Sequence, residues 1–109
     1  MIISCGANIY PAEIENVLIA HPQLTDCCVF GIPNDDWGEE IKAVVQPAPG
    51  VASDDQLRAS ILALCEKNLA KMKWPKSIDF LAELPREPNG KLYKRRLRDP
   101  YWQAHSAKV

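Results

Sequence analysis

Two apolar runs joined by a polar turn dominate the middle of the chain: Thr25-Asp26-Cys27-Cys28-Val29-Phe30-Gly31-Ile32, then Pro33-Asn34-Asp35-Asp36-Trp37-Gly38, then Ile41-Lys42-Ala43-Val44-Val45-Gln46. β-branched and aromatic residues are enriched in strands, and Pro, Asn, Asp and Gly are enriched in turns. The pattern therefore predicts an antiparallel pair of strands over 25–32 and 41–46. Successive side chains of a strand alternate between faces, so Cys27 and Cys28 should point to opposite sides of the sheet.

Amphipathic helices are predicted near residues 12–20 and 54–70. Pro11 suits the first turn of the first helix, whose apolar stripe consists of Ile14, Val17 and Leu18. Ser53, followed three residues later by Gln56, is a capping-box signature for the start of the second helix. The expected buried face of this second helix consists of Leu57, Ile61, Leu64 and Cys65.

Two shorter features complete the expected fold. Residues 77–81 alternate apolar and polar side chains as a third strand, and Gly and Asn within residues 4–8 favour a tight hairpin at the N-terminus. We expect one α+β domain. It should have a small central antiparallel sheet of about three strands flanked by helices, an N-terminal β-hairpin and a basic C-terminal loop or helix.

Composition narrows the class of protein. The 109 residues suffice for one domain, and the longest apolar run, Ile61–Cys65, is far shorter than the roughly 20 residues of a membrane-spanning helix. The net charge of −1 argues against nucleic acid as a partner. No basic residue precedes Lys42, as it would in a secretory or mitochondrial leader, so a cytoplasmic location is expected.

The four cysteines show neither CxxC spacing nor a neighbouring group of histidines. We therefore expect reduced, mostly buried thiols at Cys5, Cys27, Cys28 and Cys65, and no metal site. Charge is divided unevenly along the chain. Residues 1–41 carry −7, because they contain no Lys or Arg, and residues 42–109 carry +6. This reversal of sign needs a physical reason.

The segment most suggestive of chemistry is Pro85-Arg86-Glu87-Pro88-Asn89-Gly90-Lys91. Gly90 permits close approach of the backbone to a ligand, and the Lys91 ammonium can neutralise carboxylate or phosphate oxygens in a transition state. It is not a Walker A loop, because Pro85 occupies the first glycine position and Leu92 replaces the Mg²⁺-binding Ser or Thr. The alternative is an exposed Asn-Gly turn followed by a solvated lysine.

A basic tract begins at Lys91 and continues through Lys94, Arg95, Arg96 and Arg98. Such a run can hold an anion, an RNA or an acidic protein surface. The commoner alternative is the solvated face of a short amphipathic helix, anchored by Leu92, Tyr93 and Leu97. Neither an RNP-type aromatic motif nor a zinc-finger spacing supports RNA as the partner.

Other polar and aromatic residues point to structural roles. His21 and His105 have no Ser or Cys at motif spacing, so structural or surface positions are expected. Glu13 and Glu15 lie two apart and face different sides of a helix, so we expect them to compensate the helix dipole rather than form an acid–base pair. Trp37 could stack on a purine, although packing against its own hairpin is expected.

The N-terminal segment comprises Met1-Ile2-Ile3-Ser4-Cys5-Gly6-Ala7-Asn8-Ile9-Tyr10-Pro11-Ala12-Glu13-Ile14-Glu15. It resembles the junction motif of adenylate-forming enzymes. Three further motifs follow in the order typical of the C-terminal domain of that AMP-binding superfamily: Asp36-Trp37-Gly38-Glu39, Lys73-Trp74-Pro75, and Leu84-Pro85 through Gly90-Lys91-Leu92-Tyr93-Lys94-Arg95. The resemblance covers nearly the whole chain. The Asn8-Ile9-Tyr10-Pro11 form of the junction is similar to the acyl-CoA synthetase, or fatty-acid–CoA ligase, branch.

The resemblance implies a two-step reaction. A carboxylic acid attacks the α-phosphate of ATP, which Mg²⁺ accompanies, and releases pyrophosphate; coenzyme A then displaces AMP to give a thioester. In this family the lysine of the Gly-Lys loop enters the adenylation site, which implies a catalytic role for Lys91, beside Gly90. The domain then rotates and presents the junction hairpin to the pantetheine channel. Here that hairpin consists of Ser4, Cys5, Gly6, Ala7 and Asn8.

The resemblance also suggests partners. Lys94 and Arg95 are candidates for contacts with the phosphates of coenzyme A, and an interdomain salt bridge is equally consistent with them. The family places the ATP and acyl pockets mostly in a large N-terminal domain. We therefore expect residues 1–109 to be the C-terminal (lid) domain of an acyl-CoA synthetase, with that N-terminal domain as its partner and no acyl-CoA formation alone.

Two departures from the family pattern concern Cys5, where Gly is common, and Met72, where Tyr is frequent. Cys5 either narrows the hairpin beside the thiol path or packs beneath it.

Acetylation of Lys91 would remove its charge and silence adenylation. From a different class of function, the alternative is a stand-alone binding or regulatory module that keeps the fold without the enzymatic activity.

Overall fold

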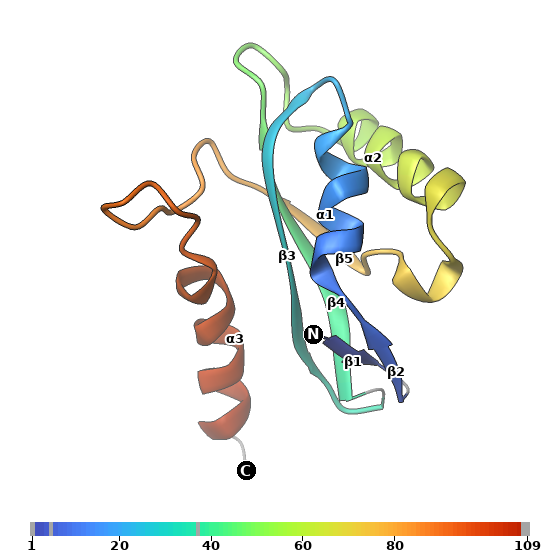
Figure 1. Cartoon of the computed structure of the whole chain (residues 1–109), viewed down its shortest axis with the longest axis vertical. Coiled ribbons are helices and arrows are strands. Elements are labelled where there is room, and N and C mark those ends of the chain that lie inside the picture. Colours follow the sequence, from blue (N-terminus) through green and yellow to red (C-terminus); the bar gives the residue numbers. More distant parts are fainter. Residues whose placement is uncertain (1, 5, 37, 108–109) are drawn as a thin grey trace.

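The computed structural model describes residues 2–4, 6–36 and 38–107, with side chains as far as Ala104. Within these residues one sheet contains the strands β1 (Ile2–Ser4), β2 (Ala7–Ile9), β3 (Leu24–Asn34), β4 (Gly38–Pro47) and β5 (Ser77–Phe80). The helices are α1 (Pro11–Ile19), α2 (Asp55–Asn68), the short 3-10 helix η1 (Lys71–Lys73) and α3 (Lys94–Ala107). Figure 1 shows α1 and α2 on one side of the sheet and α3 on the other.

β3 and β4 form the antiparallel pair that the sequence predicted, and both strands are longer than expected. Their register runs from Leu24 opposite Pro47 to Asn34 opposite Gly38. Pro33 therefore belongs to a strand rather than to the turn. It is tolerated there because β3 lies at the edge of the sheet, where a missing backbone N–H need not interrupt a ladder.

The α+β class is confirmed, and the sheet has more strands than the three expected. The N-terminal hairpin is not separate from it, because Ser4 of β1 pairs with Gly38 of β4. This pairing lets Ile2 and Ile9 reach the apolar core under α1 and α2, where both are buried. β5 runs parallel to β4 rather than antiparallel. Helix α2 carries the chain back across the sheet between these two strands, which is the connection that a parallel pair needs.

The helices begin close to the expected positions. Pro11 occupies the first turn of α1. α2 begins slightly later than the capping box predicted, because the carboxylate of Asp54, rather than the Ser53 hydroxyl, accepts the Leu57 N–H at 2.9 Å. Ile14, Leu18, Leu57, Ile61 and Cys65 are buried as expected, whereas Val17 and Leu64 are only partly buried. No helix of the described part of the chain is long and apolar enough to cross a membrane.

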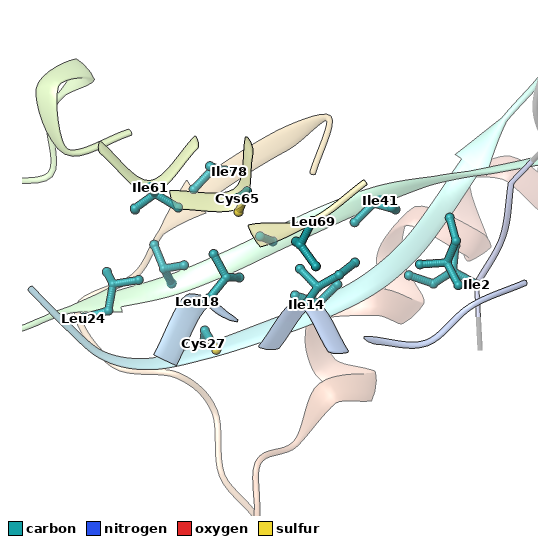
Figure 2. Close-up of a cluster of buried hydrophobic side chains, with 14 of the residues drawn as sticks. Ile2, Ile14, Leu18, Leu24, Cys27, Ile41, Ile61, Cys65, Leu69 and Ile78 are labelled. Carbon is teal, nitrogen blue, oxygen red and sulfur yellow. The ribbon is translucent and has the colours of Figure 1, made fainter. Parts of the chain in front are cut away.

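Two apolar clusters lie on opposite faces of the sheet. The large core, under α1 and α2, appears in Figure 2 and consists of Ile2, Ile9, Ile14, Leu18, Leu24, Cys27, Val29, Ile41, Ala43, Val45, Leu57, Ile61, Cys65, Leu69 and Ile78. The small core, under α3, consists of Cys28, Phe30, Val44 and Leu84. Cys27 and Cys28 therefore face opposite sides, as their adjacency predicted.

Candidate functional site

Lys91 lies in a closed hairpin between β5 and α3, here called the Lys91 hairpin (residues 86–92). Its ends meet in a bridge between Arg86 and Leu92. The Glu87 N–H donates to the Lys91 carbonyl at 2.7 Å, and the Gly90 N–H donates to the Glu87 carbonyl at 2.8 Å. Gly90 has a φ of +88°, a conformation that L side chains rarely adopt. The tight turn at the tip therefore requires glycine just before Lys91.

The side chain of Lys91 is exposed. Its backbone is fixed, because the Lys91 N–H donates to Asn89 Oδ1 at 3.1 Å. Its ammonium takes part in none of the hydrogen bonds or ion pairs that join the described residues. A cation held on a fixed backbone, with no partner in this part of its own domain, is available to an external anion.

The two residues expected to contact phosphate differ in their surroundings. Lys94 Nζ lies 3.3 Å from Glu15 Oε2, and the same oxygen accepts the Val29 N–H at 3.0 Å. Arg95 is exposed and pairs with no acid among the described residues. Arg95 is therefore available to a phosphate, whereas Lys94 would first have to leave Glu15.

Part of the charge division along the sequence is balanced by contacts inside the fold. Among the described residues, three ion pairs join an acid of the first half to a base of the second: Glu13 with Lys73, Glu15 with Lys94, and Asp26 with Arg86. Glu13 and Glu15 thus attach η1 and α3 to α1, a larger role than compensating the helix dipole. The reversal of sign partly reflects contacts between the two halves of the chain.

The strands of the junction hairpin (residues 2–9), β1 and β2, belong to the sheet, whereas the Lys91 hairpin lies beside the start of α3 in Figure 1. Gly6 in its turn is exposed, has a φ of +79°, and has no atom within 4 Å of the place where a Cβ would stand. Ser4 pairs with Ala7, and Asn8 is exposed. The site residues named from the sequence therefore form two separate surfaces. Cys5, Trp37 and the side chain of His105 lie outside the described residues.

The described cysteines are free, buried thiols, as expected. Burial, aided by the charges of Glu15 and Asp26, raises the pKa of Cys27 to about 12. Burial also raises the pKa of Cys28 to about 12 and that of Cys65 to about 11. Since the thiolate is the nucleophilic form, these three side chains are inert near neutral pH. Within the described residues, no group of three His, Cys, Asp or Glu side chains has the arrangement of a metal site.

The fold also creates a Ser–His pair that spacing did not reveal. His21 Nε2 lies 2.8 Å from Ser60 Oγ, and His21 Nδ1 accepts the Gln23 N–H at 3.1 Å. Because Nδ1 is an acceptor, this hydrogen-bond network assigns the proton to Nε2, which donates to the Ser60 hydroxyl. A base that activates serine must instead accept the serine proton. The pair is therefore structural, which agrees with the role predicted for His21.

Lys42 is a buried cation that the sequence did not single out. Its Nζ lies 2.9 Å from Asp79 Oδ2 and 5.2 Å from the centre of the Tyr101 ring. Burial lowers the pKa of Lys42, but its hydrogen bonds with Asp79 and Tyr101 outweigh this effect and leave the pKa above its ordinary value. The charged Lys42 therefore links α3 to β4 and β5.

Most of the chain, residues 13–91, matches the model of one family, the AMP-binding enzyme C-terminal domain. The chain is 40% identical over 108 residues to a fatty acid–[acyl-carrier-protein] ligase of Streptomyces coeruleorubidus, covering 99% of this chain and 20% of that protein. It is 46% identical over 99 residues to a 2-succinylbenzoate–CoA ligase of Bacillus pumilus, covering 90% and 19%. An anthranilate CoA ligase solved with anthranoyl-AMP superposes with a TM-score of 0.88 at 30% identity, covering 97% of this chain and 20% of that one.

These matches define the class as the C-terminal part of adenylate-forming enzymes, and the resemblance found in the motifs is confirmed. The chain belongs to the AMP-binding enzyme C-terminal domain family. It spans about a fifth of the length of the relatives that it matches.

Proposed function

We propose that residues 1–109 are the C-terminal catalytic domain of an ATP-dependent, AMP-forming acid–CoA ligase. In the first half-reaction a carboxylate oxygen attacks the α-phosphate of ATP, the bond to pyrophosphate breaks, and an acyl-adenylate forms. Mg²⁺ accompanies the ATP. Lys91 neutralises the carboxylate and phosphate oxygens as they approach each other. The observation that carries this role is the exposed Lys91 ammonium, without an ionic partner in the described part of the chain, on a fixed hairpin.

The junction hairpin serves the second half-reaction. The thiol of coenzyme A attacks the acyl carbon, AMP leaves, and a thioester forms. Ser4, Gly6, Ala7 and Asn8 border the thiol path together with Cys5, and the absence of a side chain at Gly6 leaves room for it. Arg95, and Lys94 if it leaves Glu15, bind phosphates of coenzyme A. The separation of the two hairpins supports a reorientation of the domain between the half-reactions.

The partner of this domain is the large N-terminal domain of the same enzyme, which holds the acid. The relatives' names differ in the acid, with fatty acid, succinylbenzoate and anthranilate among them, as expected if this domain does not select it. Alone, the domain makes no acyl-CoA. Free thiols suit a reducing compartment, and we place the enzyme in the cytoplasm.

Lys91→Ala in the complete enzyme tests the first half-reaction. We expect acid-dependent ATP–pyrophosphate exchange to fall by about 100-fold or more, because a preorganised charge is lost, while CoA transfer from supplied acyl-adenylate is retained. Lys67→Ala, which changes an exposed lysine on α2, is the control and should alter neither half-reaction. If Lys91→Ala also leaves both intact, Lys91 is not catalytic and the binding-module alternative is favoured.

Gly6→Ala tests the second half-reaction, with Gly50→Ala as its control. Both glycines have positive φ, +79° and +84°, and both have open space where a Cβ would stand. Each variant should lose about 1 kcal/mol of stability from backbone strain. Only Gly6→Ala should slow CoA transfer, and neither should slow pyrophosphate exchange. An equal loss of transfer in Gly50→Ala would attribute the effect to strain and would remove the role of the hairpin.

A further inference from the structure

The Lys91 hairpin is anchored to the sheet where the register of β3 changes. The pairing with β4 shifts between Leu24 and Asp26, where β3 contains one extra residue. Such a bulge turns the side chains beside it. Beyond the shift, Asp26 stands opposite Gln46. These two cross-strand neighbours both bind the segment that leads to Lys91.

Gln46 holds the start of that segment. Its Oε1 accepts the Leu84 N–H at 3.0 Å, and the Leu84 side chain is buried in the small core. Asp26 holds the next part. Its Oδ1 accepts the Cys27 N–H at 2.8 Å, which fixes the carboxylate and leaves Oδ2 to pair with Arg86.

Arg86 extends this anchor to the tip of the hairpin. Its Nη2 pairs with Asp26, and its Nη1 donates to the carbonyl of Gly90 at 3.2 Å. The guanidinium presents its donors in a rigid, planar fork, so one side chain joins the carbonyl at the tip to β3. The backbone bonds of Glu87 and Gly90 close the hairpin but join only its own residues. The Gly90 carbonyl belongs to the peptide that leads directly into Lys91.

We propose that Arg86 is a positioning residue for Lys91, acting through the Gly90 carbonyl and the Asp26 carboxylate. This inference rests on the proposed function of Lys91. Without the Arg86 fork, the tip loses its fixed place on β3 and its internal bonds open more often, so the ammonium occupies a wider range of positions. Adenylation then slows, because catalysis by a placed charge falls steeply with displacement. The thioester step, on the junction hairpin, is unaffected.

Arg58 on α2 provides a matched control. Its guanidinium also bridges an aspartate and a backbone carbonyl, pairing with Asp55 at 2.9 Å and donating to the Ile78 carbonyl at 3.4 Å. The side chains of Arg58 and Arg86 are both 43% exposed. In the complete enzyme we expect Arg86→Gln to lower pyrophosphate exchange about ten-fold and to leave CoA transfer unchanged. Arg58→Gln should leave both rates unchanged.

Two further measurements separate positioning from general destabilisation. In the Lys91→Ala enzyme, Arg86→Gln should cause no additional loss of pyrophosphate exchange, because both substitutions remove the same contribution. Amide hydrogen exchange at Glu87 and Gly90 should accelerate in Arg86→Gln and not in Arg58→Gln. If Arg86→Gln does not fold, Asp26→Asn takes its place, since the single amide oxygen keeps the bond to the Cys27 N–H and the amide NH2 replaces the oxygen that pairs with Arg86.

The outcomes distinguish this inference from the function on which it rests. Losses of rate that multiply in the double variant, or unchanged exchange of the two amides, would overturn the positioning role. If Lys91→Ala itself retains pyrophosphate exchange, the proposed function fails instead. The amide measurement then decides by itself whether Arg86 fixes the hairpin.

Discussion

The two faces of the sheet are held together in different ways. Under α1 and α2, the large core takes aliphatic side chains from all five strands and both helices. Under α3, the small core buries four side chains, and the helix is also held by polar contacts: Trp102 Nε1 donates to the Gly31 carbonyl at 2.9 Å, and Lys42 lies against Tyr101. Burial of apolar surface supplies most of the stability of a fold. We therefore expect the α3 face to open first and the large core to unfold last.

The two candidate surfaces therefore differ in stability: the junction hairpin packs into the large core, and the Lys91 hairpin lies on the side of the small core. The junction hairpin is fixed by Ile2 and Ile9, which belong to the large core. The Lys91 hairpin packs against the small core through the partly buried Leu92, and the Arg86–Asp26 pair connects its tip to β3. Lys91, the lysine proposed to act in adenylation, thus stands on the less stable face, where we propose that the Arg86 side chain sets its position.

The largest effect is expected from cavities in the two cores. Ile61→Ala should lower the free energy of unfolding by about 3 kcal/mol, because Ile61 is fully buried in the large core. Leu97→Ala should cost less than about 2 kcal/mol, because Leu97 is only partly buried against the small core. Urea unfolding followed by circular dichroism measures both values. Equal losses would contradict the proposed difference between the faces.

Alkaline pH should weaken both faces through their thiols. The ordinary pKa of 9.0 rises on folding to about 12 for Cys28 and to about 11 for Cys65. The unfolded chain therefore releases these protons first, so stability is complete below pH 9 and is lost as the pH rises towards 11 or 12. Each thiol should contribute up to about 1.4 kcal/mol per pH unit in that window.

Urea unfolding at pH 8 and pH 10 tests this expectation. Cys28→Ala and Cys65→Ala should each reduce the difference between the two pH values by about 1 kcal/mol. Any cavity that the substitution leaves contributes equally at both pH values. A pH dependence that neither variant changes would exclude these thiols as its cause.

Opening of the α3 face alone should expose Cys28. Trp102→Phe removes the donor to the Gly31 carbonyl and should lower the free energy needed to open the α3 face by about 1 kcal/mol. Thiol labelling of Cys28 should therefore accelerate about five-fold. Labelling of Cys65, in the large core, should not change. Trp74→Phe is the control, because Trp74 Nε1 makes a similar 2.9 Å bond to the Leu69 carbonyl on the other face. If Cys65 also reacted faster in Trp102→Phe, the two faces would open together.

The smallest effects are expected from the ion pairs of α1. Lys73→Met, which breaks the pair with Glu13, and Lys94→Met, which breaks the pair with Glu15, should each cost less than about 1 kcal/mol. Both losses should shrink at high salt, because the partners are partly exposed. Lys94→Met should also increase labelling of Cys28, whereas Lys73→Met should not. A loss above about 2 kcal/mol in either variant would indicate a buried network instead.

Local patterns in the sequence were sufficient for most of the elements. The strand pair, the two amphipathic helices, the N-terminal hairpin and the opposite directions of Cys27 and Cys28 follow from periodicity and from turn-forming residues. The Gly90-Lys91 dipeptide was likewise noticeable in the sequence, because the glycine permits close approach of the backbone to a ligand and the lysine can neutralise its oxygens. These features depend only on residues close together in the chain.

Tertiary structure alone decided the contacts that join distant segments. The parallel pairing of β5, the His21–Ser60 hydrogen bond, the Glu15–Lys94 pair and the Arg86–Asp26 anchor connect residues far apart in sequence. Periodicity predicts which face of a strand or helix is buried, but not which surface will cover it. That choice depends on the register of β3 with β4 and on the path of the chain through α2. The sequence by itself thus singled out Lys91 as a candidate, and only the fold determined which contacts hold its hairpin in place.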